Sequence, residues 1–249
     1  MIAFADPVFR SVGHEEEAQP RDSVTMRSLP SFYDGSVLNI EALAAQLPPL
    51  PGTRKEVEQI ASSLQVPESD IKLGVAATET AVKQAKLEQY RIVYFATHAL
   101  VSGDLQNFAK AGTEPALVFT IPEQVDDGLL YASEAAQLKL NADWVVLSAC
   151  NTASADSAGA EALSGLARAF FYAGARSLLV SHWQVSDIST PQLMTSVFSA
   201  AQNTNLSHAE LLQRAQIQIL DKATSASAAH PRNWAPFVVV GEPARGLLP

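Results

Sequence analysis

The sequence is most informative at residues 143–149, which read DWVVLSA and are followed directly by Cys150. This short apolar run is bounded by polar and small residues, which predicts a buried β-strand. Residues 91–96 read RIVYFA, have the same character and come just before His98. We therefore expect two buried strands, each followed by a side chain that can take part in acid–base or nucleophilic chemistry.

Outward from these two runs, strand-like and helix-like segments alternate along the chain. We expect further strands at residues 2–5, 71–75, 116–120, 177–180 and 237–240. We expect helices at residues 54–64, 78–89, 133–139, 163–174, 190–201 and 207–220. Continuous apolar strands that alternate with helices are typical of a mostly parallel sheet covered on both faces. The predicted fold class is therefore α/β, with three layers.

The chain length and the positions of residues that interrupt regular structure indicate the domain organisation. A chain of 249 residues fits one large domain or two small ones, and no linker rich in Pro, Gly or Ser interrupts its middle. We expect a single domain over residues 1–249, in which residues 10–50 form a long loop or insertion and a proline-rich connector. Thr53 and Glu56 match a capping box that would start the helix after this connector.

Composition and missing motifs exclude several functions. The formal net charge of −9 argues against nucleic acid and anionic lipid as partners. No window approaches 18 apolar residues and no secretory signal is visible, so we expect a cytoplasmic protein without a membrane partner. The usual motifs of nucleotide-binding glycine loops, serine hydrolases and zinc peptidases are absent from the sequence, and a single cysteine builds no thiolate cluster. We expect neither cofactor nor metal.

His98 and Cys150 are the candidate catalytic residues because each follows a predicted strand. In open parallel α/β sheets, ligands and catalytic residues collect at the carboxyl ends of the strands. If the two strands are neighbours, about 5 Å apart, the imidazole can hold the thiol proton while the thiolate attacks an acyl carbon. An inert core cysteine and a structural histidine are the alternatives. His14, His208 and His230 are expected to be solvated surface residues.

A series of motifs runs in order along the chain. They are FATHA at 95–99, DGLL at 127–130, VVLSAC at 145–150, GLARAF at 165–170, AGARS at 173–177, SHWQVSD at 181–187 and HPRNWAPF at 230–237. Together these motifs resemble the CHAT family, caspase-like domains found with tetratricopeptide repeats and related to caspases and separase. The interval between His98 and Cys150 is also close to the roughly 50 residues found in caspases. The resemblance leaves open whether this chain is the C-terminal part of a longer protein or a compact variant.

The resemblance implies a caspase-like fold and a cysteine endopeptidase without a cofactor. His98 would be the general base or imidazolium partner and Cys150 the nucleophile, with the backbone N–H groups of Cys150 and Ala99 as the oxyanion hole. A protein or peptide substrate would add a strand to the sheet edge beside Cys150. An activating partner or a tetratricopeptide-repeat region is a further expected partner.

Three aspartates are candidate substrate-binding residues. Asp187, Asp127 and Asp156 follow predicted strands or lie in the loops near the expected cleft. Their carboxylates would favour a basic residue before the scissile bond, because opposite charges attract most strongly where water is excluded. The alternative is that they are solvated loop residues.

Two departures from the family pattern keep other functions open. Ala99 stands where the family has glycine after the histidine, and Ala153 stands where a glycine commonly follows the cysteine. A Cβ at a position that needs positive φ costs about 1–2 kcal/mol and misaims a backbone N–H. A weak or inactive scaffold that binds a protein partner, or a redox-sensing domain in which Cys150 is oxidised, is therefore the alternative function.

Overall fold

A computed structural model describes residues 1–9, 33–34, 37–38, 44, 47–100, 114–121, 126–149, 165–201 and 205–242 of the protein. A six-stranded sheet forms its centre, with the strand order β11-β10-β9-β5-β1-β4. The strands are β1 (Ile2–Ala5), β4 (Ile71–Leu73), β5 (Ile92–Ala96), β9 (Trp144–Leu147), β10 (Ser177–Ser181) and β11 (Phe237–Gly241). All neighbours pair in parallel except β10 and β11, so the predicted α/β fold with a mostly parallel sheet is confirmed.

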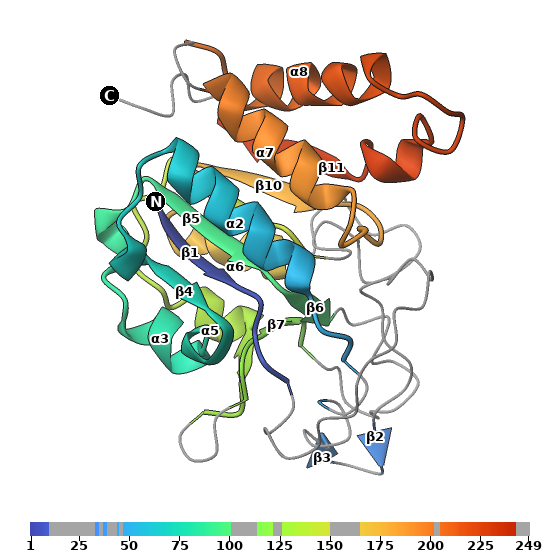
Figure 1. The fold of residues 1–249 in the computed structure, drawn as a ribbon. Coiled ribbons are helices and arrows are strands. Elements are labelled where there is room, and N and C mark those ends of the chain that lie inside the picture. The colour runs from blue at the N-terminus through green and yellow to red at the C-terminus, as the bar shows by residue number, and fades with distance from the viewer. Residues whose placement is uncertain are drawn as a thin grey trace.

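Helices cover both faces of this sheet (Figure 1). One layer contains α2 (Pro51–Ser63), α7 (Thr190–Ala201) and α8 (His208–Asp221). The opposite layer contains α3 (Glu79–Gln84), α5 (Ala132–Ala135) and α6 (Gly165–Tyr172). The side chains of β5 alternate between the two cores: Tyr94 packs in the α2–α7–α8 core, and Phe95 packs in the other. Burial on both faces explains why the strand reads as a continuous apolar run.

A second, three-stranded antiparallel sheet continues from the end of β5. It contains β6 (His98–Leu100), β7 (Ala116–Val118) and β8 (Leu129–Tyr131), in that order. Only Thr97 separates β5 from β6, so the chain leaves the central sheet and enters the smaller one within one residue. A short hairpin of β2 (Tyr33–Asp34) and β3 (Val37–Leu38) completes the described strands.

The start of α2 differs from the predicted capping box. The helix begins at Pro51, with Leu50 at its N-cap, and not after Thr53. A proline is favourable in the first helical turn because its missing N–H has no intrahelical acceptor there. Thr53 Oγ1 instead donates to the Leu50 carbonyl at 2.7 Å, and the buried Glu56 carboxylate accepts from the Tyr94 hydroxyl at 2.7 Å.

The helix predicted over residues 78–89 is shorter than expected. Thr78 caps it as predicted, since its Oγ1 accepts from the Ala81 N–H at 3.0 Å, but α3 ends at Gln84 and a 3₁₀ turn follows at Leu87–Gln89. Both Val82 and Leu87 are buried. Residues five apart lie about 140° around an α-helix, so a continuous helix would not turn both side chains toward one core.

Several other elements are also shorter than predicted. The strand predicted over residues 71–75 ends at Leu73 and is followed by a 3₁₀ turn over Gly74–Ala76. The helix predicted over residues 133–139 is α5 alone. A further 3₁₀ turn, Pro231–Asn233, precedes β11, and one at Glu68–Asp70 precedes β4. Among the described residues, no helix is both long and apolar enough to cross a membrane.

His208 is fully buried, so the prediction of a solvated surface residue was wrong. Its ring is stacked on Trp144, with the ring centroids 4.2 Å apart, and its Nδ1 lies 2.7 Å from Ser177 Oγ. Ser177 donates its one proton to the Asp143 carbonyl, so Nδ1 carries the histidine proton in this bond. Burial lowers the pKa of His208 to about 4 and keeps the ring neutral.

Candidate active site

The carboxyl ends of β5 and β9 lie side by side in the central sheet. Their register pairs Ile92 with Trp144 and Phe95 with Leu147, and the Ser148 N–H donates to the Phe95 carbonyl at 2.8 Å. The neighbouring strands that the sequence analysis required are therefore present. His98 follows one strand, and Cys150 follows the other but lies outside the described residues. The pairing of their side chains stays a prediction.

Both chain segments that leave these strands are anchored. Thr97 Oγ1 donates to the Val118 carbonyl and ties the turn before His98 to β7. Ser181 Oγ, at the end of β10, donates to the carbonyl of Ala149. Ala149, the last described residue before Cys150, is fully buried.

His98 is fully buried as the first residue of β6. Its Nε2 lies 2.9 Å from the carbonyl oxygen of Pro48, and its ring centroid lies 5.2 Å from that of Phe9. A carbonyl only accepts hydrogen bonds, so Nε2 must carry the proton, and the lone pair of the neutral ring is on Nδ1. The Pro48 carbonyl thus sets both the tautomer and the orientation of the imidazole.

Ala99 lies in β6, paired with Leu117, and is buried. The only non-glycine residues with positive φ in the described part of the chain are Asp6 and Gln65. Ala99 therefore does not have a positive φ. The backbone strain that a Cβ would cause at such a position is absent at Ala99. Ala153, the other departure, lies outside the described residues.

Of the three candidate substrate-binding aspartates, two are described. Asp187 Oδ2 accepts from the Gly52 N–H, at the start of α2, at 2.9 Å. Asp127 Oδ1 accepts from the Leu129 N–H at 2.9 Å across the turn that precedes β8. Asp156 lies outside the described residues. Both described carboxylates thus bond to backbone N–H groups within the protein.

The start of α2 gathers further charge at the same edge of the sheet. Asp6, directly after β1, pairs with Arg54 at 2.7 Å. Burial raises the pKa of Asp6 above its ordinary value, although Arg54 opposes this; the nearby negative charge of Asp187 adds to the rise. The two aspartates therefore share one electrostatic environment, next to the helix end that carries partial positive charge.

The sequence analysis missed Glu79, which holds the turn of the DGLL motif. Its buried carboxylate accepts from the Gly128 N–H at 3.0 Å, where Gly128 has a φ of +80°, and pairs with Lys83 at 2.5 Å. Burial raises the pKa of Glu79, and Lys83 opposes this. The position of Glu79 directly after the cap Thr78 was the available signal, because acidic residues are common in a first helical turn.

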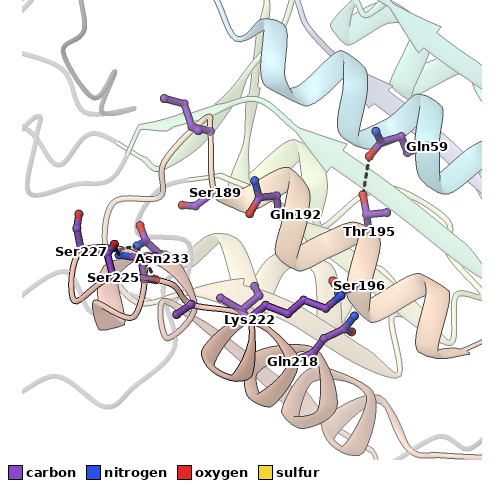
Figure 2. Close-up of a pocket in the computed structure, with 14 residues that line it drawn as sticks. Gln59, Ser189, Gln192, Thr195, Ser196, Gln218, Lys222, Ser225, Ser227 and Asn233 are labelled. Atoms are coloured by element: carbon purple, nitrogen blue, oxygen red, sulfur yellow. Dashed lines mark hydrogen bonds between the residues drawn. The ribbon is translucent and has the colours of Figure 1, made fainter.

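No group of three or more histidine, cysteine, aspartate or glutamate side chains is placed to hold a metal ion, as far as the described residues extend. A hollow of about 680 Å³ lies elsewhere, between α2, α7, α8 and the segment after α8 (Figure 2). Its labelled polar side chains are mostly amides and hydroxyls, and Lys222 is the charged residue among its lining. None of the described candidate site residues lines it.

Comparisons with known proteins agree with this architecture. The model of the CHAT domain family matches residues 3–242. Tetratricopeptide repeat protein 28 of Mus musculus is 28% identical and covers 95% of this chain; the Homo sapiens protein is 29% identical and covers 68%. The chain spans only 11% and 8% of the lengths of these two relatives.

Two solved structures are similar to this chain. One is the Saccharomyces cerevisiae separase–securin complex, with a TM-score of 0.50 and 16% identity over 80% of this chain and 12% of that one. The other is the Arg-specific cysteine proteinase gingipain R, with a TM-score of 0.48 and 12% identity over 77% of this chain and 42% of that one. The predicted caspase-like α/β/α fold is confirmed.

Proposed function

The chain belongs to the CHAT domain family, and on this premise we propose that it is a cysteine endopeptidase in which His98 and Cys150 form the catalytic pair. The observation that carries the proposal is the pairing of β5 with β9. It brings together, at the same edge of the sheet, the ends of the two strands that precede these residues in the chain. The bond from His98 Nε2 to the Pro48 carbonyl supports the proposal further, because it gives Nδ1 the lone pair of a base.

The reaction begins when His98 Nδ1 takes the proton of Cys150 Sγ. The thiolate attacks the carbonyl carbon of the scissile bond, and the electron pair moves onto the carbonyl oxygen. The backbone N–H groups of Cys150 and Ala99 stabilise this oxyanion. The C–N bond then breaks, and the imidazolium returns its proton to the leaving amine.

The thioester that remains is hydrolysed in a second step. Water attacks its carbonyl carbon while His98 accepts the water proton, and the acid product leaves as the thiol of Cys150 forms again. Asp127, Asp156 and Asp187 are the proposed source of a preference for a basic residue before the scissile bond, since their negative charge attracts a cation. No metal or cofactor takes part in this scheme.

Covalent labelling tests the proposal directly, because Cys150 is the single cysteine of the chain. The purified protein is treated with a peptidyl acyloxymethyl ketone that carries Arg or Lys next to the reactive group, and mass spectrometry locates the adduct. A matched reagent with a neutral residue measures the basic preference. We expect one adduct on Cys150, absent in Cys150→Ala and slowed about 10²-fold or more in His98→Ala.

A second candidate function is a protein-interaction module with an unused pair. It is favoured by the names of the curated relatives, which describe tetratricopeptide repeats and no peptidase. In that case neither the ketone nor iodoacetamide labels Cys150 faster than an ordinary thiol, and His98→Ala changes neither rate. Fast iodoacetamide labelling without peptide cleavage would instead indicate a redox-sensing thiol.

A further inference from the structure

The proline-rich connector and the first turn of α2 that follows it, together residues 48–53, are attached to the rest of the protein at three points. At one end, the Pro48 carbonyl accepts from His98 Nε2 at 2.9 Å. At the other end, the Gly52 N–H donates to Asp187 Oδ2 at 2.9 Å. One residue after Gly52, Thr53 Oγ1 accepts from the Asp6 N–H at 2.9 Å. The connector therefore joins His98 to the segment that follows β10.

The contact between Gly52 and Asp187 is close as well as hydrogen-bonded. A Cβ on Gly52 would lie 2.0 Å from the Asp187 carbonyl oxygen and 2.7 Å from Asp187 Cγ, distances that no real Cβ tolerates. The Gly52 N–H belongs to the first turn of α2, where backbone N–H groups have no intrahelical acceptor. A carboxylate at this end also gains from the helix dipole of a 13-residue helix. Both the bond and the close approach hold the helix start against Asp187.

The connector itself transmits position because it is stiff. Pro49 and Pro51 each have a φ held near −65° by their rings, which removes two of the rotatable backbone bonds between the Pro48 carbonyl and Gly52. Leu50, the remaining residue, is fully buried. We therefore expect a displacement at Gly52 to shift the Pro48 carbonyl.

We propose that Asp187 is a positioning residue for His98: through the Gly52 N–H and the proline-rich connector, it holds the Pro48 carbonyl that orients the imidazole. This inference rests on the proposed function, in which His98 is the base. It gives Asp187 a role in every reaction of Cys150, including reactions with small neutral reagents. A role in binding a basic substrate residue would affect charged substrates only.

Four variants test the role. Asp187→Ala removes the acceptor and the charge, Asp187→Asn keeps an oxygen acceptor, and Gly52→Ala forces the two segments apart. Glu210→Ala is the matched control, since Glu210 is a carboxylate in the first turn of α8 that bonds the Ser207 N–H at 2.7 Å. Circular dichroism and thermal unfolding establish that each variant is folded.

Two readouts are compared across the variants. The first is the ¹⁵N NMR spectrum of the His98 ring, assigned with His98→Gln, which reports the tautomer without any need for activity. The second is the pH profile of Cys150 alkylation by iodoacetamide, which reports the pKa of the thiol. We expect Asp187→Ala and Gly52→Ala to lose the Nε2–H tautomer preference and to alkylate about tenfold more slowly at pH 6.5, as for a rise of about one unit in the thiol pKa. Asp187→Asn should keep most of the tautomer preference and most of the alkylation rate, and Glu210→Ala should change neither quantity.

Failure of the inference and failure of the proposed function give different results. If the wild-type thiol has a low pKa that depends on His98, but Asp187→Ala changes neither readout, the positioning role is refuted and the catalytic pair stands. If the wild-type thiol ignores His98→Gln, the proposed function is refuted. The positioning role of Asp187 is then refuted as well, because it requires His98 to act as the base. The NMR spectra show separately whether the connector orients the His98 ring.

Discussion

Acidification should destabilise this protein through His208, and the variant His208→Gln isolates that effect because glutamine does not titrate. The folded state keeps the His208 ring neutral, with its pKa lowered to about 4 by burial, whereas the ordinary pKa of histidine is 6.5. Between these two values the unfolded chain binds a proton that the folded chain does not. The stabilisation is therefore fully present above pH 6.5 and is lost as the pH falls toward 4.

The magnitude follows from the size of the pKa shift. A difference of one pKa unit corresponds to 1.36 kcal/mol, so lowering the pKa of His208 from 6.5 to about 4 corresponds to about 3 kcal/mol at most. This is a large part of the 5–15 kcal/mol typical of a folded domain. The His208 ring is fully buried, is stacked on Trp144 and donates its Nδ1–H to Ser177 Oγ, and burial is the main cause of the lowered pKa.

Urea unfolding at pH 7.5, 6.5, 5.5 and 4.5, followed by circular dichroism, measures the effect. At pH 7.5 the wild type should be more stable than His208→Gln, and this gap should shrink by roughly 1.4 kcal/mol per pH unit below pH 6. Other groups, such as Asp6 and Glu79, titrate in both proteins, so their effect cancels in the difference in free energy of unfolding between the wild type and His208→Gln. Val197→Ala, which truncates a buried side chain in α7, is the control. The difference in free energy of unfolding between the wild type and this variant should not depend on pH. A gap for His208→Gln that is equally constant would refute the reasoning.

Three further substitutions test the packing that supports the site. Gly174→Ala should cost about 1–3 kcal/mol in urea unfolding, because Gly174 has a φ of +110° and a Cβ there would lie 2.5 Å from the Leu140 carbonyl oxygen. Tyr94→Phe should cost about 1–3 kcal/mol, since the buried carboxylate of Glu56 loses a donor at 2.7 Å; the loss should be measured at pH 7. Leu193→Ala should cost about 2–5 kcal/mol by opening a cavity in the core beneath α7.

Each of these substitutions has a matched comparison. Gly165→Ala, where a Cβ meets only the side chain of Pro115 at 3.2 Å or more, should cost less than Gly174→Ala, and equal costs would contradict the role of backbone conformation. The double variant Tyr94→Phe with Glu56→Leu should recover part of the loss, and no recovery would show that the hydrogen bond is not its cause. Ile188→Ala, at an exposed side chain, should leave stability nearly unchanged, unlike Leu193→Ala.

The elements that the sequence predicts correctly are those with strong local patterns. The apolar runs of β5, β9 and β10 are recognised because both faces of these strands are buried, and α7 because its apolar residues recur with helical spacing. Element ends were predicted less well. Thr53 matches a capping box, yet the helix starts at Pro51, because contacts from Asp6 and Asp187 decide where the helix begins.

Local sequence was enough to establish the α/β class, the strands that precede His98 and Cys150, and the motifs that place the chain in its family. These properties depend on residues close together in the chain, where composition and spacing carry the information. Three contacts became known from the folded protein alone: β5 lies next to β9, the Pro48 carbonyl faces His98, and Asp187 bonds to the start of α2. The folded protein also shows that His208 is buried against Trp144. Each of these contacts joins residues at least 50 positions apart. A local sequence pattern does not identify the distant residue that a backbone group or a ring will contact.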